Sequence, residues 1–113
     1  MSRRIIIRDS AFDDLDEISA YISENSPRAS VRFLEEAQKA FALIEVMPGI
    51  GTRRDYDNPA FSGMRVWPVP KFSKYLIFYL TTHETVEIVR ILHGARNIQS
   101  VFSPEENNDR PDI

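Results

Sequence analysis

The 113-residue chain lacks cysteine, has only two histidines and contains no long apolar run. The absence of cysteine excludes a disulfide scaffold, a thiolate metal site and a cysteine nucleophile, and it fits a cytoplasmic protein. Two histidines without helical pairing to carboxylates do not make a metal site, so we expect neither metal nor cofactor. The apolar stretch at the N-terminus, Ile5–Ile7, is far shorter than the roughly 18 residues of a membrane span. We therefore expect no signal peptide and no membrane partner.

Charge is spread unevenly along a chain whose total is −3. Residues 63–102 carry five basic and two acidic side chains, whereas residues 103–113 carry one basic and four acidic. The whole chain is thus not the strongly basic object that a dedicated nucleic-acid binder would be. Its length fits one domain, which we place at residues 1–102, followed by a polar tail at residues 103–113.

The N-terminal part predicts a strand followed by a helix. The β-branched run over residues 4–8 is typical of a strand. Apolar side chains then recur at helical spacing over residues 11–24. Ser10 and Asp13 have the form of a capping box at the start of this helix. Its many acidic side chains are expected to face solvent.

A second helix is predicted from Pro27 to about Met47. Ser26 can cap this helix, and proline suits its first position because the missing N–H would have no helical partner there. The connection between the two helices is so short that they should form an antiparallel hairpin. The expected buried stripe of the second helix is Phe33, Leu34, Ala37, Phe41 and Ile44.

The second half of the chain changes to the two-residue period of strands. Residues 52–62 indicate a loop, and strands are predicted at residues 63–69, 75–80 and 85–92, the last two as a hairpin. A short helix or an extended segment can follow as far as Phe102. The order predicts an α+β fold (β-α-α-β-β-β) in which the helical hairpin packs on a mostly antiparallel sheet of about four strands.

Four side chains in the strands have more than one interpretation. Arg65 and Trp67 share a face of their strand. Either Trp67 fills core or sheet-edge space and Arg65 covers it, or the two form a binding surface, since Trp and Arg dominate interface hot spots. His93 is a structural residue that hydrogen-bonds the turn, a general acid or base, or a partner contact. Arg90 needs a carboxylate or solvent, and an ion pair is favoured.

Four stretches of the chain, in order and spacing, resemble the RelE/ParE toxin superfamily over about residues 5–102. They are the opening helix at residues 11–22, the turn Pro48–Gly51, the strand entry Gly63–Arg65 and the hairpin Tyr75–Arg96. The resemblance implies one of two activities. RelE-like members cut mRNA on the ribosome, whereas ParE-like members poison DNA gyrase without a reaction of their own.

The choice between these branches depends on single residues. Metal-free RNA cleavage needs cations at the phosphate and groups that move protons. By the resemblance, Leu76 and Phe102 stand where RelE-like enzymes carry an arginine and a tyrosine. We therefore predict a ParE-type toxin with no catalytic residues. The alternative, a ribosome-dependent mRNA endonuclease, would use Arg65, Lys71, Lys74 and Arg96.

The resemblance also implies partners. It predicts a ParD-like antitoxin in a heterotetramer or larger assembly, DNA gyrase as the target, plasmid stabilisation as the biological effect, and contact with DNA only through the antitoxin. The apolar positions of the two helices cannot all face one small sheet, so some of them should await a partner. The candidate antitoxin groove is Phe12, Leu15, Tyr21, Phe33 and Phe41. Candidate partner-binding residues on the sheet are Arg65, Trp67, Tyr75, His93 and Arg96.

Overall fold

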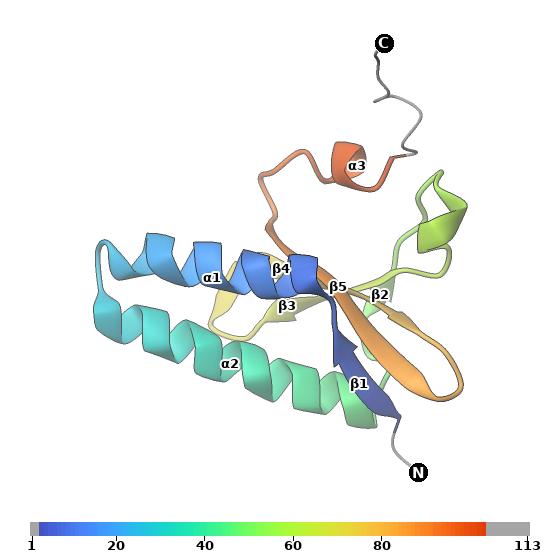
Figure 1. Cartoon of the computed structure of the whole chain (residues 1–113), viewed down its shortest axis with the longest axis horizontal. Helices are drawn as coiled ribbons and strands as arrows, with labels where there is room; N and C mark the ends of the chain where they lie inside the picture. Colours follow the sequence, from blue (N-terminus) through green and yellow to red (C-terminus); the bar gives the residue numbers. More distant parts are fainter. Residues whose placement is uncertain (1–2, 104–113) are drawn as a thin grey trace.

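A helical hairpin and a sheet make up most of the computed structural model, which describes residues 3–103. Figure 1 shows the two long helices side by side and the short C-terminal helix well away from both. All of the predicted tail except Ser103 lies outside the described residues. The elements are β1 (Arg4–Ile7), α1 (Asp9–Ser23), α2 (Pro27–Val46), β2 (Thr52–Arg53), the 3₁₀ turn η1 (Pro59–Phe61), β3 (Arg65–Val69), β4 (Phe72–Thr81), β5 (Thr85–His93) and α3 (Ile98–Val101).

The sheet has five strands in the order β1-β5-β4-β3-β2. β1 pairs with β5 in parallel, and the other neighbours pair antiparallel. The predicted α+β order is therefore confirmed, with β2 as an addition inside the predicted loop at residues 52–62. β2 consists of two residues paired with β3, too short a run for a periodic pattern to reveal.

The predicted capping box at the start of α1 is wrong. The helix begins at Asp9, and the residue before it, Arg8, makes no capping bond with its side chain. The Ser10 hydroxyl lies in the first turn and donates to the carbonyl of Val89 at 3.0 Å. β1 runs into α1 without a loop, because the Arg8 N–H still bonds the sheet at Ile88. Ser10 therefore comes too late in the chain to cap the helix.

The start of α2 is confirmed. The Ser26 hydroxyl accepts a hydrogen bond from the Ala29 N–H at 3.1 Å, and Pro27 occupies the first helical position. The Ser30 hydroxyl donates to the carbonyl of Ser19 at 2.9 Å and so ties the beginning of α2 to the end of α1. These local bonds close the hairpin that positions the two helices on the sheet.

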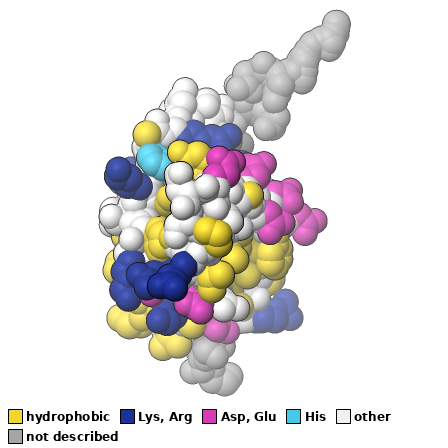
Figure 2. Space-filling model, turned by 90° about the vertical axis from the view of Figure 1, so that its left-hand side faces the viewer, with side chains coloured by type: hydrophobic (Ala, Val, Ile, Leu, Met, Phe, Trp, Pro, Cys, Tyr) yellow, Lys and Arg dark blue, Asp and Glu magenta, His cyan; other side chains and the backbone are white. Residues whose placement is uncertain are grey.

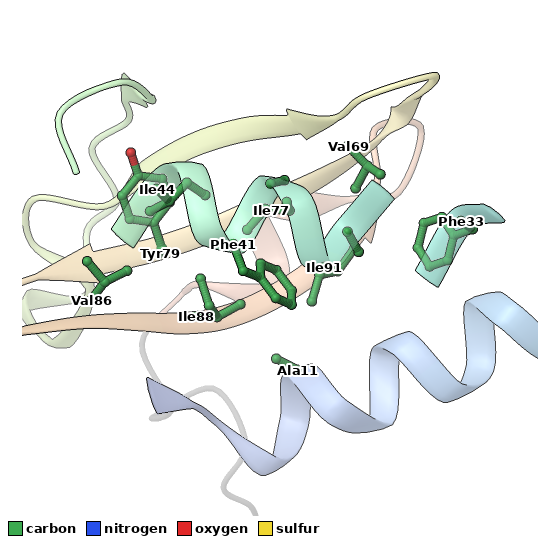
Figure 3. Packing of buried hydrophobic residues seen from close by; sticks show 12 residues of the cluster. Ala11, Phe33, Phe41, Ile44, Val69, Ile77, Tyr79, Val86, Ile88 and Ile91 are labelled. Carbon is green, nitrogen blue, oxygen red and sulfur yellow. The ribbon is translucent and has the colours of Figure 1, made fainter. Parts of the chain in front are cut away.

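Apolar side chains pack on both faces of the sheet. The larger cluster lies between the sheet and the hairpin, and Figure 3 shows its side chains converging from α1, α2 and the strands. A smaller cluster covers the opposite face, which we call the back face. Its buried members are Met64, Val66, Phe78, Val89, Leu92 and Phe102. The sheet is thus the middle layer of the molecule.

A β-bulge interrupts β5. Phe78 of β4 lies opposite Arg90, but the next residue, Tyr79, lies opposite Ile88, so Val89 has no partner on β4. Such an extra residue bends its strand and disturbs the ladder of backbone hydrogen bonds. Val86 and Ile88 belong to the helix side and Val89 to the back face. Beyond the bulge the alternation is shifted by one residue, so that Ile91 belongs to the helix side and Leu92 to the back face.

The N-terminal half of α1 covers the edge of β5 where β1 has ended. In addition to the Ser10 bond at the bulge, the Asp14 carboxylate accepts from the Ile91 N–H at 2.9 Å. It also receives two hydrogen bonds from the Arg90 guanidinium at 2.7 and 2.9 Å, which raise the pKa of Arg90 above its ordinary value. The predicted ion pair of Arg90 is confirmed. The expected solvation of the acidic helix is wrong for Asp14, which is buried because it satisfies β5.

Candidate partner-binding site

A groove of about 410 Å³ lies on the hairpin between α1 and α2. The hairpin presents several large apolar side chains to solvent, including Phe12 at 51% exposure and Val31 at 58%. Figure 2 shows apolar side chains exposed beside a group of acidic ones on one face of the molecule. The groove is lined by Ile7, Phe12, Leu15, Asp16, Val31, Leu34, Glu35, Ala37, Gln38 and Phe41.

The groove brings together three of the five predicted groove residues. Phe12 and Leu15 line it from α1, and Phe41 forms part of its floor from α2. Tyr21 is 63% exposed but lies outside the lining. Phe33 is fully buried, with its ring 5.5 Å from those of Phe72 and Tyr75. It is therefore a core residue and not part of the groove.

Sequence reasoning missed Val31 and Leu34, which α2 contributes to this groove in addition to Phe41. Leu34 was expected inside the stripe that faces the sheet, but it is 41% exposed and lines the groove. Val31 lies three residues before Leu34, which places both on one face of the helix. In the sequence, a second apolar face is indicated by Val31 and Leu34, because Leu34 directly follows Phe33 and so lies beside the buried stripe.

Tyr75 and His93 lie together at one end of the sheet. They are cross-strand neighbours, with ring centroids 5.1 Å apart at nearly right angles. His93 Nδ1 accepts a hydrogen bond from the Ala95 N–H at 3.0 Å, which supports the structural interpretation of this histidine at the turn. Burial is the main cause that raises the pKa of Tyr75, and nearby Tyr21 adds to it. Tyr75 is partly buried and packs against the helix-side cluster.

Arg65 and Trp67 lie elsewhere, on the helix side of β3. Arg65 Nη1 donates to the carbonyl of Gly51 at 2.8 Å. The Tyr79 hydroxyl donates to the Pro48 carbonyl at 2.7 Å and accepts from the Gly51 N–H at 2.8 Å. Arg65 and Tyr79 therefore hold the turn after α2. Burial raises the pKa of the Tyr79 hydroxyl. Trp67 packs half-buried against the helix-side cluster, and its Nε1 has no hydrogen-bond partner among residues 3–103.

Lys74 and Arg96 are exposed near the Tyr75–His93 pair. The Gly94 N–H donates to the Lys74 carbonyl at 2.7 Å, and the Arg96 N–H donates to the His93 carbonyl at 3.0 Å. Lys71, in the turn before β4, lies 3.4 Å from the buried carboxylate of Glu36. Its charge is thus already partly neutralised within the chain.

Leu76 and Phe102 belong to the back-face cluster. The Phe102 side chain is 1% exposed, and its ring lies 4.9 to 5.1 Å from those of Tyr56, Phe61 and Phe78. Leu76 packs against the same cluster. The two positions that decided between the branches are therefore occupied by apolar packing and offer neither a cation nor a hydroxyl.

Neither a metal centre nor a membrane span is found in the part of the chain that the structure describes. Residues 3–103 hold no group of three histidine, aspartate or glutamate side chains placed to bind one ion. Their helices are too short or too polar to cross a membrane. The groove on the hairpin combines an apolar lining with three of the predicted groove residues.

Comparison with known proteins agrees with the resemblance. A sequence model described as "ParE toxin of type II toxin-antitoxin system, parDE" matches residues 5–98. A solved structure, "Chromosomal ParDE TA system from P. aeruginosa", aligns with a TM-score of 0.65 at 16% identity, over 81% of this chain and 96% of that chain. At this identity the likeness shows the fold alone. No match was found among curated protein sequences.

Proposed function

The chain belongs to the ParE toxin family of type II toxin–antitoxin systems, and from this premise we propose that it inhibits growth by binding and poisoning DNA gyrase. In this proposal a cognate ParD-like antitoxin neutralises it, and the toxin performs no reaction of its own. The toxin contacts DNA only indirectly, through the antitoxin. The effect on a host would be retention of the DNA that encodes the pair.

The observation that carries the choice of target is the packing of Phe102. RNA cleavage without a metal needs a proton donor or acceptor beside the phosphate. In the resemblance this function falls on a tyrosine at the position of Phe102, but here the ring is buried among three other aromatic rings. A toxin that lacks this group and the cation at Leu76 is better suited to binding than to cutting.

A gyrase assay tests this proposal directly. Purified toxin is added in excess to gyrase and relaxed plasmid, and supercoiling and trapped cleaved DNA are measured. We expect inhibition of supercoiling and accumulation of cleaved complex, both relieved by the antitoxin. Normal supercoiling with no cleaved complex would refute gyrase as the target.

The groove on the hairpin supports neutralisation by an antitoxin. Its lining exposes Phe12, Val31 and Leu34 to water, and apolar grooves between helices are common docking sites for amphipathic segments. Expression of the toxin alone should arrest growth, and expression of the neighbouring antitoxin gene should relieve the arrest. Arrest that persists with the antitoxin present would refute this part of the proposal.

A second candidate function is mRNA cleavage on the ribosome. It is favoured by Lys74 and Arg96, which are exposed near the same turn. Mapping of mRNA 5′ ends after induction tests it, with Arg96→Ala as the variant. Cuts phased with codons that disappear in Arg96→Ala would establish this activity in place of gyrase poisoning. Random 5′ ends, unchanged by the substitution, would exclude it.

A further inference from the structure

The groove between α1 and α2 carries negative charge beside its apolar lining. Asp16 from α1 and Glu35 from α2 are among its lining residues, whereas no lysine or arginine is. Both carboxylates are exposed. The apolar side chains therefore account for only part of what an occupant meets.

The two carboxylates face the groove from opposite helices at similar heights. The Ser30 hydroxyl bonds the Ser19 carbonyl and fixes the alignment of the antiparallel hairpin. Counting back from this contact, Asp16 lies within about one helical turn of Glu35 along the groove. An occupant that covers the centre of the groove thus passes both carboxylates.

Neither carboxylate is neutralised by the chain itself. Asp16 and Glu35 form no ion pair among residues 3–103, although Arg32 and Lys39 lie three and four residues from Glu35 on α2. Lys39 and Lys71 lie 3.6 and 3.4 Å from Glu36, and Arg90 is paired with Asp14. An apolar segment without compensating charge would cover the two carboxylates. The carboxylates would then lose part of their hydration, which weakens binding.

We propose that the groove selects its partner by charge as well as by shape. It takes an amphipathic segment whose apolar side chains enter between Phe12 and Leu34, while lysine or arginine side chains beside them pair with Asp16 and Glu35. This inference rests on the proposed function, because the segment is assigned to the antitoxin. A segment with the same apolar side chains but acidic flanks binds less tightly, since like charges across an interface oppose association.

The test compares two charge-neutralised toxins that differ only in where the charge is removed. Asp16→Asn/Glu35→Gln removes the two groove carboxylates, and Asp13→Asn/Glu24→Gln removes two exposed carboxylates of α1 and its end that do not line the groove. Binding of each full-length toxin to the cognate antitoxin is measured at low and high sodium chloride. Circular dichroism and melting temperature confirm that both variants fold.

We expect the groove variant to bind about tenfold more weakly at low salt, mainly through slower association. The difference from wild type should shrink at high salt, because salt screens exposed charges. The control variant should bind like wild type at both salt concentrations. This outcome would assign the effect to the two groove carboxylates and not to the net charge of the toxin.

Three outcomes would overturn the proposal. Equal binding of the groove variant and wild type at low salt would refute charge selection while leaving antitoxin binding intact. An equal loss in both variants would assign the effect to net charge and would also refute it. Absence of binding by wild-type toxin would instead refute the proposed function, and this inference with it. A reciprocal variant, Asp16→Lys/Glu35→Lys, should bind more tightly than wild-type toxin to an antitoxin whose groove-facing lysines and arginines are replaced by glutamate.

Discussion

The two faces of the sheet are covered in different ways. On the helix side, two long helices supply buried side chains such as Phe33, Ala37 and Ile44 and still expose apolar side chains on their outer surface. On the back face, loops and the single turn of α3 cover a smaller cluster around Phe102. The helical layer therefore has a second, exposed apolar surface, whereas the loops and α3 on the back face do not.

This difference indicates which layer of the molecule serves partner binding and which serves only stability. An amphipathic helix has one stripe for the core, but α2 adds Val31 and Leu34 beside that stripe. The short α3 has no room for two such surfaces. Partner binding can therefore reside in the helical layer without exposing the core, while changes on the back face act mainly on stability.

The largest effect is expected from Phe33→Ala, which removes a fully buried ring from the helix-side cluster. We expect the free energy of unfolding to fall by about 4 kcal/mol, because the lost apolar contacts leave a cavity. Urea denaturation followed by circular dichroism measures this loss.

The matched control is its neighbour Leu34→Ala, which changes the groove and not the core. It should cost roughly 1 kcal/mol of stability, because the side chain is partly exposed, but it should weaken antitoxin binding. Equal destabilisation by the two substitutions would contradict the division between core and groove.

A smaller loss is expected from Asp14→Ala, which unties α1 from the edge of β5. The substitution leaves the Arg90 guanidinium and the Ile91 N–H without their acceptor, and breaking a buried pair of this kind costs about 3 kcal/mol. Asp14→Asn keeps an acceptor for the amide and should cost less. Thermal unfolding of both variants provides the measurement, and a harmless Asp14→Ala would show that the contact contributes little.

Phe102→Tyr tests whether the back face is sealed. The added hydroxyl enters an aromatic cluster that is 1% exposed at this residue, and an unpaired buried hydroxyl costs about 2 kcal/mol. Phe102→Leu, which adds no polar group, serves as the control for altered packing. Wild-type stability in Phe102→Tyr would mean that the cluster is open to water, and the comparison between the faces would then fail.

The smallest effect is expected from pH. The Arg8–Glu87 ion pair, with N and O 2.7 Å apart, lowers the pKa of Glu87 below its ordinary value. A folded-state pKa below the unfolded one adds stability above the unfolded pKa, and this stability is lost as pH falls through the folded value. After allowance for solvent screening, we expect a loss of at most about 0.5 kcal/mol. Denaturation of wild type and Glu87→Gln between neutral and acidic pH isolates this contribution, and identical pH profiles would contradict it.

Local chemistry predicts much of this fold. Ser26 and Pro27 mark the start of α2, the short connection predicts the hairpin, and β-branched runs mark the long strands. The bond between Ser10 and Val89 and the burial of Asp14 could not be predicted in the same way. They depend on where β5 bulges, and that position is set by packing of residues distant in the sequence.

The candidate site was predictable only in part. Phe12 and Leu15 of the groove follow from the apolar positions of the first helix. The choice between Phe33 and Leu34 does not, because neighbouring apolar residues on α2 fit a buried stripe equally well. Which of them faces the sheet is decided by the rotation of α2 against Phe72 and Tyr75.

The contact of α1 with the edge of β5 also constrains the order in which the parts of the chain fold. Ser10 and Val89 are 79 positions apart in the chain, and Asp14 and Ile91 are 77 apart. Contacts between such distant positions form late and slow the folding of a domain. During synthesis from the N-terminus, α1 can reach its final place only after β5 has been made. A nascent chain that ends before Thr85 therefore lacks the edge to which α1 docks, and we expect the complete groove only once the last strand has joined the sheet.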